Sequence, residues 1–514
     1  MNIILPEFFE ELVLVLYFLA LLILCVFGFH GYVMVYLYKK HERRKPKRLR
    51  GEMDDWPVVT VQLPIYNEYY VVERLIDAAC ALDYPREKLE IQVLDDSTDE
   101  TVDKSRELVE KYQKLGFNIQ LLHRKHRTGY KAGALREALV KARGEYIAIF
   151  DADFIPPQDF LKRTIPYFRN RKIGMVQARW GYLNQDYSLL TRAQAIGLDG
   201  HFVVEQAARN RSGFFINFNG TAGVWRRECI LDAGNWSDDT LTEDLDLSYR
   251  AQIKGWKFLF LQDLVCLSEI PANITAVKAQ QFRWTKGAIE TAKKILPRLW
   301  RARLPLSIKL QGTLHLTNNL VFPFIFMIAL MNLPLLLIKN GPRDHSLYFA
   351  ISSIFVLAFF GSFLLYKMSQ QEIYPDWKRR LAYFPVFMAG SMGLSVSNTW
   401  AILEGLFNIK SPFQRTPKYR IERREDTWIG KKYQSPLTPG LAIEAFMTLY
   451  SFASLGLAVY YFEWSAVPFL TMFAMGFAFI TMLSFMQTRM SPLGLWRRKF
   501  RSRFWREKEL LQSN

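Results

Sequence analysis

Cysteine and histidine are scarce in this sequence. Its 514 residues include seven histidines and four cysteines. The cysteines are Cys25, Cys80, Cys229 and Cys266, without C-x-x-C spacing. This excludes a disulfide scaffold and a thiolate zinc site, and it favours a reducing compartment. The close pair His123 and His126 lies in a basic stretch that suits phosphate contacts or solvent better than a metal.

Internal repeats, heptad arrays and low-complexity linkers are also absent from the sequence. Half of the residues are hydrophobic and 15% are aromatic, which excludes a disordered or collagen-like chain. Charged residues still make up 23%, so the average combines long apolar runs with a polar globular part.

The net charge of +18 is distributed in a way that argues against nucleic acid as a partner. Lysine and arginine are concentrated in Lys39–Arg50, Asn408–Tyr433 and Arg489–Lys508, and each block lies beside a long apolar run. Basic blocks of this kind mark the cytoplasmic side of a membrane protein. We therefore expect a lipid bilayer, and no nucleic acid, as a partner.

Five apolar runs are long enough to cross a hydrocarbon core of about 30 Å. They are Leu12–Tyr38, Leu314–Ile338, Leu347–Tyr366, Leu441–Phe462 and Ala466–Met486. The first is not a signal peptide because it is too long, its basic cluster follows it, and no small-residue cleavage site appears. Glu7, Glu10 and Glu11 precede it without any lysine or arginine, so we expect the N-terminus outside.

A sixth apolar run, Leu381–Phe407, is predicted to lie in the membrane interface or to re-enter the membrane. Small and polar residues such as Gly390, Ser395 and Asn398 interrupt it. A full crossing would place the basic segment 408–433 and the basic tail 491–514 outside, against the distribution of charge. Both are therefore expected in the cytosol.

Residues 51–305 have the pattern of a soluble α/β domain. Helical patterns, for instance Lys131–Arg143, alternate with short β-rich runs. These runs are Val58–Leu63, Glu90–Leu94, Asn118–Leu122, Tyr146–Phe150 and Gly174–Ala178. The alternation predicts a mostly parallel, Rossmann-like sheet covered on both faces. Ligands of such sheets bind at the carboxyl ends of the strands.

Two acidic motifs follow predicted strands. Asp95-Asp96 follows the second strand, and Asp151-Ala152-Asp153 follows the fourth. Carboxylates at strand ends are often turn formers or helix caps. Two clusters at the predicted ligand edge instead favour a site, and the Asp-x-Asp pair offers hard oxygen ligands for Mg²⁺ or Mn²⁺ that carries substrate phosphates.

Two further clusters come later in the domain. Thr242-Glu243-Asp244 could be a capped helix start, with acids in the first turn. Gln280-Gln281-Phe282-Arg283-Trp284 could be an aromatic and basic anchor beside the membrane. Each cluster alone has such a structural explanation.

The order of these motifs ahead of a group of spans resembles the processive family 2 glycosyltransferases, which include the cellulose, hyaluronan and chitin synthases. The resemblance covers about Val58 to Lys418. The branch most similar in sequence is the plant cellulose-synthase-like group that makes mannan and xyloglucan backbones, together with its bacterial relatives. This similarity lies in Phe218–Arg227 and Gln177–Asn184. The resemblance implies a GT-A α/β domain followed by an α-helical transmembrane region.

The resemblance also implies roles for individual residues. Asp244, with Glu243 beside it, would be the general base, and Asp151 and Asp153 would hold the Mg²⁺ or Mn²⁺. The nucleotide, diphosphate and acceptor sugar would be bound by Tyr66, Glu68, Asp95, Asp96, Lys131, Asp151, Gln280, Arg283 and Trp284.

Ser411–Lys418, SPFQRTPK, is similar to the gating-loop pattern Phe-x-Val-Thr-x-Lys of that family. Phe413, Thr416 and Lys418 match the pattern, whereas Arg415 replaces the valine. The loop would close over bound nucleotide, which requires it to be cytosolic.

The implied function is a membrane-embedded, inverting and processive transferase. It would polymerise sugar from UDP-glucose or GDP-mannose onto a growing polysaccharide, as a β-1,4-glucan or mannan, and extrude the product. The implied organisation begins with a transmembrane helix and basic linker (1–50), followed by a cytosolic catalytic domain (51–305) with an interfacial helix near 275–300. A channel region (306–490) comes next and contains the interfacial helix 381–407 and the gating loop 408–433. A basic cytosolic tail (491–514) ends the chain. The membrane would be a bacterial inner, Golgi or plasma membrane.

Two other functions compete with this one. A transferase that adds one sugar to a membrane lipid, such as a ceramide glucosyltransferase, shares the aspartate motifs and Gln-x-x-Arg-Trp. The gating-loop pattern and the number of spans favour the polymerase. A transporter or scaffold that retains an inactive transferase domain is disfavoured by the intact Asp153, Asp244 and Trp284.

Overall fold

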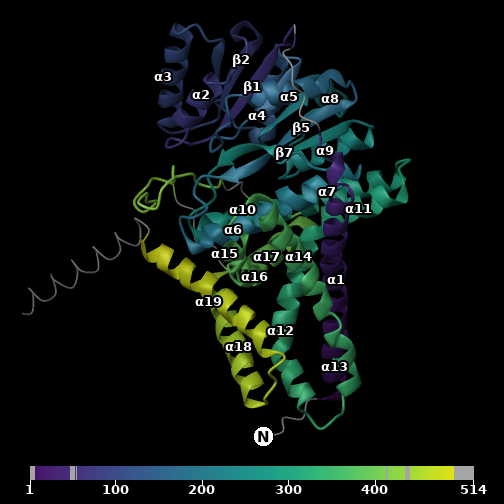
Figure 1. Cartoon of the computed structure of the whole chain (residues 1–514). Coiled ribbons are helices and arrows are strands. Elements are labelled where there is room, and N and C mark those ends of the chain that lie inside the picture. Colours follow the sequence, from purple (N-terminus) through teal and green to yellow (C-terminus); the bar gives the residue numbers. More distant parts are fainter. Residues whose placement is uncertain (1–5, 47–52, 54, 412–414, 434–439, 491–514) are drawn as a thin grey trace, which may run out of the picture.

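The computed structural model describes residues 6–46, 53, 55–411, 415–433 and 440–490. A domain built on one β-sheet stands on a bundle of long helices, and α10 and α6 lie between the two regions (Figure 1). The C-terminal tail from residue 491 lies outside the described residues.

The sheet has seven strands in the order β3-β2-β1-β4-β6-β5-β7. Their bounds are β1 Val59–Ile65, β2 Leu89–Asp95, β3 Ile119–His123, β4 Tyr146–Ile149, β5 Ile173–Tyr182, β6 Gly223–Arg226 and β7 Lys257–Ser268. Only β6 runs antiparallel to its neighbours, β4 and β5. The predicted mostly parallel sheet is therefore confirmed.

The strands are buried because both faces of the sheet are covered. On β1, Val59, Val61 and Leu63 point into one core with α2 and α3, while Thr60 and Gln62 point to the other face, where they bond to β2. The core on the second face packs α4, α7, α8 and α9 against the sheet. It also includes residues from the ends of α1 and α14 that lie nearest the sheet.

All five runs predicted as strands are strands, but β6 and β7 were not predicted. β6 has only four residues, GVWR, and a run this short does not show a recognisable strand pattern in the sequence. β7 lies at the edge of the sheet beside β5, and its twelve residues mix buried and exposed positions without a strict alternation.

The α-helices between β1 and α12 are α2 Val72–Cys80, α3 Thr101–Lys114, α4 Tyr130–Lys141, α5 Phe160–Thr164, α6 Leu189–Asp199, α7 Gln206–Arg211, α8 Arg227–Asp232, α9 Glu243–Ile253, α10 Ile274–Arg301 and α11 Leu306–Thr317. A π-helix, Gly200–Glu205, joins α6 to α7. The remaining helices are α1 Glu7–Lys40, α12 Val321–Lys339, α13 Ser346–Ser353, α14 Val356–Ile373, α15 Trp377–Leu381, α16 Phe384–Gly393, α17 Ser395–Leu406, α18 Leu441–Tyr460 and α19 Val467–Met490.

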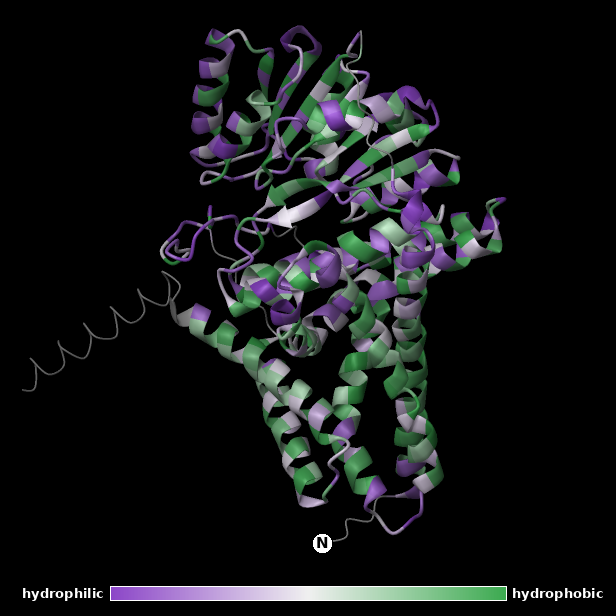
Figure 2. Cartoon of the chain, in the orientation of Figure 1, coloured by the Kyte–Doolittle hydropathy of each residue, from purple (hydrophilic) through white to green (hydrophobic). Residues whose placement is uncertain are grey.

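Within the described residues, five helical stretches are long and apolar enough to cross a membrane. They are Glu7–Lys40, Leu306–Lys339, Ser346–Ile373, Leu441–Tyr460 and Val467–Gln487. Each of them overlaps one of the five predicted spans. Figure 2 shows hydrophobic residues along these helices and hydrophilic residues concentrated over the sheet-bearing half.

The segment predicted as interfacial forms a broken pair of helices. Trp377–Gly393 and Ser395–Leu406 pass the length and hydropathy test together but are bent by 46° at their junction. α17 packs along α10, and Figure 1 shows α16 and α17 beneath α10, at the end of the bundle nearest the sheet. An interfacial position for this pair stays a prediction.

Candidate functional site

The principal polar cavity lies at the carboxyl edge of the sheet, between β1 and β4. The chain leaves β1 toward β2 on one side, whereas β4 has β6 and β5 on its other side, so the strand order diverges here. Such a divergence opens a crevice for a ligand. The cavity is lined by most of the predicted site residues: Tyr66, Glu68, Asp96, Lys131, Asp151, Asp153, Glu243, Asp244, Gln280, Arg283, Trp284, Thr416 and Lys418.

The Asp-x-Asp turn follows β4, and each of its carboxylates is paired with a lysine. Lys131, in the first turn of α4, donates to Asp151 Oδ1 at 2.5 Å and to the Gly220 carbonyl at 2.9 Å. Lys418 Nζ donates to Asp153 Oδ2 at 2.6 Å. Burial by itself lowers the pKa of Lys131, but the charges of Asp151, Glu243 and Asp244 outweigh it and raise that pKa, which keeps the amine protonated.

The two aspartates fit a divalent cation that a substrate also ligates. Among the described residues, no group of three or more histidine, cysteine, aspartate or glutamate side chains could hold a metal ion alone. Asp151 and Asp153 would supply part of an oxygen shell, and Mg²⁺ or Mn²⁺ characteristically completes such a shell with water and substrate phosphates.

Glu68, just after β1, is held by a residue from the distant segment 415–418. Arg415 Nη1 lies 2.9 Å from Glu68 Oε2 and also donates to the carbonyls of Tyr66 and Asn67. Burial raises the pKa of Glu68 to about 7, Arg415 opposes this rise, and the charge of Asp153 adds to it.

Asp96 and Tyr66, which line the cavity, are each contacted by an arginine. Arg124 makes two bonds to the Asp96 carboxylate, at 2.7 and 2.6 Å, and the Arg127 guanidinium lies 3.5 Å from the centre of the Tyr66 ring. Asp95 does not line the cavity. It is fully buried, and its Oδ1 accepts the Ser97 N–H at 2.9 Å.

Asp244 lies in the first turn of α9 and faces the Asp-x-Asp turn across Gly220. Gly220 has φ +79°, and a Cβ there would approach Asp244 Oδ2 to 3.1 Å, so a glycine both permits the turn and leaves room for the carboxylate. Burial, and then the charge of Glu243, raises the pKa of Asp244 to about 7. A buried carboxyl that titrates near neutrality is suited to proton transfer.

Thr242 does precede helix α9, but its hydroxyl does not cap it. Thr242 Oγ1 lies 3.0 Å from Thr291 Oγ1 of α10, and no side-chain cap bond is formed. The cluster therefore packs against α10 in addition to starting a helix.

Gln280, Arg283 and Trp284 lie on one face of α10, as their spacing of three and four residues requires. The opposite face carries two buried lysines. Lys278 pairs with Glu444 of α18 at 2.6 Å, and Lys286 pairs with Glu404 of α17 at 2.8 Å. α10 thus presents its motif to the cavity while ion pairs fix its other face to the bundle.

The polar cavity residues that were not predicted as site residues include Arg127, Asn219, Glu269 and Arg415. The basic stretch around His123 could have identified Arg127 as a site residue. The departure from the gating-loop pattern could have identified Arg415. Glu269 follows β7, which was not predicted, so its place at a strand end had no signal. Phe413 lies outside the described residues.

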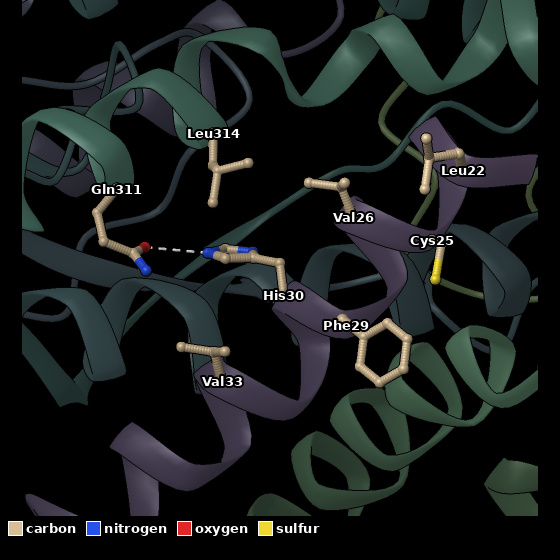
Figure 3. A pocket seen from close by; sticks show the side chains of 8 residues that line it. All are labelled: Leu22, Cys25, Val26, Phe29, His30, Val33, Gln311 and Leu314. Carbon is tan, nitrogen blue, oxygen red and sulfur yellow. Dashed lines mark hydrogen bonds between the residues drawn. The ribbon is translucent and has the colours of Figure 1, made fainter. Parts of the chain in front are cut away.

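A second groove lies between α1 and α11. Figure 3 shows apolar side chains from both helices, with His30 Nε2 at 3.0 Å from Gln311 Oε1. The described residues that line this groove include no lysine, arginine or carboxylate. It therefore does not offer the charges that a nucleotide would need.

Comparison with known proteins agrees with this geometry. Residues 57–287 match the family model described as "Glycosyltransferase like family 2". The chain is 43% identical over 297 residues to "Glucomannan 4-beta-mannosyltransferase 2" of Arabidopsis thaliana, and 38% identical over 373 residues to "Probable glucomannan 4-beta-mannosyltransferase 3" of Oryza sativa subsp. japonica. Residues 57–287 therefore form a glycosyltransferase family 2 domain.

These matches cover part of each protein. The Arabidopsis match spans 55% of this chain and 55% of that relative, and the rice match spans 69% and 66%. The chain thus spans about half to two thirds of the length of the curated relatives it matches.

A solved structure supports the fold. A mannosyltransferase from Pyrobaculum calidifontis, in complex with GDP-Man and Mn²⁺, superposes with a TM-score of 0.53 at 20% identity, covering 77% of this chain and all of that one. The sheet-bearing half of this chain therefore has the GT-A fold that the sequence predicted.

Proposed function

We propose that this protein is a membrane-embedded, inverting glycosyltransferase that extends a β-linked polysaccharide, a β-1,4-mannan or glucomannan, from a nucleotide-sugar donor. The observation that carries the proposal is the convergence of the Asp-x-Asp turn, Asp244 and the Gln280–Trp284 face of α10 on one cavity. The cavity thereby brings together residues that could bind a donor diphosphate, a carboxylate that could accept a proton and an aromatic face for a sugar.

The residues divide the chemistry between them. Asp151 and Asp153 would hold Mg²⁺ or Mn²⁺, which would neutralise charge that develops on the departing diphosphate. Lys131 and Arg283 would add positive charge to the same group. Asp244 would take the proton of the acceptor hydroxyl, which attacks the anomeric carbon as the bond to the diphosphate breaks.

Inversion at the anomeric carbon follows from direct attack by the acceptor. One base and a departing diphosphate suffice for a single displacement, with no covalent sugar–enzyme intermediate. An α-linked donor then gives a β-linked product. The proposed roles of Tyr66, Glu68 and Asp96 are to hold the nucleoside, and that of Trp284 is to stack on the acceptor sugar.

Mannose is the proposed donor sugar because the relatives are named as mannosyltransferases of glucomannan. The sequence features alone leave glucose open as the donor sugar. The decisive experiment incubates membranes that contain the full chain with GDP-mannose, GDP-glucose, UDP-glucose or UDP-N-acetylglucosamine. We expect polymer from GDP-mannose that a β-1,4-mannanase digests and a cellulase does not.

Other outcomes of that experiment would overturn specific parts of the proposal. Polymer made from UDP-glucose alone would replace mannose by glucose. A labelled product that extracts into organic solvent and carries one sugar would support a lipid glycosyltransferase and exclude the polymerase. An Asp244→Asn membrane preparation provides the blank.

Export across the membrane is part of the proposal and depends on topology. Glu10 of α1 pairs with Arg343 at 2.7 Å, so the N-terminal end of α1 and the loop before α13 lie at the same end of the bundle. That end is opposite the sheet in Figure 1. We propose that it faces outward and that the catalytic half is cytosolic.

Cysteine labelling tests this topology in sealed right-side-out vesicles. A cysteine in place of Asp344 should react with an impermeant thiol reagent, and one in place of Ser411 should not. A cysteine at Ser491, which lies outside the described residues, should also resist. Labelling at Ser411 would mean that 381–407 crosses the membrane, and segment 415–418 could then not serve a cytosolic site.

A further inference from the structure

Glu269, which follows β7, makes hydrogen bonds that its position at a strand end does not explain. Its side chain is 3% exposed, yet both carboxylate oxygens are used on a segment about 150 residues away. Oε1 accepts the Tyr419 N–H and Oε2 accepts the Arg420 N–H, each at 2.9 Å. Two consecutive amides aimed at one anion form a compact anion-binding turn, and Arg420 has the positive φ, +55°, that such a turn uses.

The residue before this turn is Lys418, which reaches the cavity. Lys418 Nζ donates to Asp153 Oδ2 at 2.6 Å and to the backbone carbonyl of Glu269 at 3.1 Å. Glu269 therefore contacts the segment three times, twice through its side chain and once through its carbonyl. These contacts determine where the Lys418 amine lies relative to the Asp-x-Asp turn.

Arg74 of α2 supports the same arrangement. Its guanidinium lies 3.9 Å from Glu269 Oε2 and pairs with Glu422 at 2.7 Å, beyond the turn. Burial raises the pKa of Glu269, while Arg74, Lys418 and the Tyr419 amide oppose that rise. The hydrogen bonds from these donors replace the water that the carboxylate loses on burial.

No strand pairs this turn with the sheet in the described residues 415–433. The segment 415–433 follows α17 and contains no strand or helix, so no backbone ladder sets its register against β4 or β7. A side-chain anchor is the available way to place Lys418 within reach of a diphosphate that binds at Asp153.

We propose that Glu269 is a positioning residue for donor binding: by holding the Tyr419–Arg420 amides, it places the Lys418 amine against the Asp153 edge of the cavity, where that amine binds the donor diphosphate. This inference rests on the proposed function, because it assumes that a nucleoside diphosphate occupies the cavity. Glu269 itself acts through Lys418 and does not touch the substrate.

The test is a double-mutant cycle on the solubilised full chain. Glu269→Gln keeps one acceptor oxygen for the two amides, Lys418→Met removes the amine, and the double variant combines them. Affinity for GDP in the presence of Mn²⁺ is measured by calorimetry. Each single variant should weaken binding roughly tenfold, and the double variant should be no weaker than Lys418→Met alone.

Two controls separate positioning from a general loss of structure. Glu444→Gln removes an equally buried carboxylate that pairs with Lys278 on the opposite side of α10, and it should leave GDP affinity unchanged. Guanosine, which has no phosphate, should bind Glu269→Gln as well as it binds the wild type, measured by competition with a fluorescent GDP analogue.

The possible results distinguish this inference from the proposed function. Additive losses in the double variant, about a hundredfold together, or equal losses for GDP and guanosine, would overturn the role of Glu269 in placing Lys418. Wild-type GDP affinity in Glu269→Gln would overturn it as well. If the wild-type chain binds neither GDP nor UDP with Mn²⁺, the proposed function fails and this inference fails with it.

Discussion

The cavity has two parts that the fold holds in different ways. Tyr66, Glu68, Asp151 and Asp153 follow parallel strands, so backbone ladders between β1, β2 and β4 fix their positions. The segment 415–418 is attached through side chains, in the pairs Arg415–Glu68 and Lys418–Asp153 and the bonds from Glu269. The strand-end part should therefore keep its structure when one residue is substituted, whereas the position of segment 415–418 should depend on its individual side-chain contacts.

The largest expected effect is that of metal removal, which tests the strand-end part. EDTA should reduce transferase activity to background, and Mg²⁺ or Mn²⁺ should restore it, because Asp151 and Asp153 offer hard oxygen ligands beside the diphosphate site. Asp153→Ala should abolish activity and metal-dependent GDP affinity, whereas the exposed Asp263→Ala should change neither. Full activity in chelator would contradict a metal-dependent site.

Asp244→Asn should have the next largest effect. The substitution keeps the volume and removes the proton acceptor, so turnover should fall by about 10²–10⁴-fold. GDP affinity should stay close to that of the wild type because the nucleoside and diphosphate contacts remain. Near-normal turnover of Asp244→Asn in a radiolabelled mannose incorporation assay would assign the base elsewhere.

The pH profile should show Asp244 as a base with a raised pKa. Because the deprotonated form is active and its pKa is about 7, kcat/KM should fall about tenfold per pH unit below 7 and level off above it. Glu243→Gln removes a charge that raises this pKa, so the acidic limb should move to lower pH. An unmoved limb would mean that another group controls it.

Arg415→Val, which restores the residue of the family pattern, should have the smallest effect and compares the two parts directly. It removes the ion pair to Glu68 but leaves Lys418 in place, so the donor KM should rise by roughly threefold to tenfold with little change in kcat. The exposed Arg423→Val serves as the control. A loss in kcat of a hundredfold or more would show that Arg415 takes part in the chemical step.

Much of the strand-end part could be predicted from local sequence. The runs before Asp95 and Asp151 have strand-like residues and short lengths, and the alternation with helices predicts parallel neighbours whose carboxyl ends meet. The same reasoning placed Asp95 in the site together with Asp96. Adjacent residues of an extended chain point in opposite directions, and only Asp96 faces the cavity.

The sequence alone also determined which helices could lie in a membrane, because length and hydropathy are local properties. It did not determine which acid each lysine or arginine meets. The chain has 49 acidic residues, and Lys418 meets Asp153, 265 positions away, only once the chain has folded.

The local structure of each motif was thus determined by the sequence around it, because a strand, a turn or one helix face depends only on neighbouring residues. The tertiary structure decided that Glu269 and Arg415 border the cavity, and that Lys278 and Lys286 hold the opposite face of α10. The physical reason is that a buried charge selects its partner by distance and desolvation, and both exist only once the sheet and the bundle have packed.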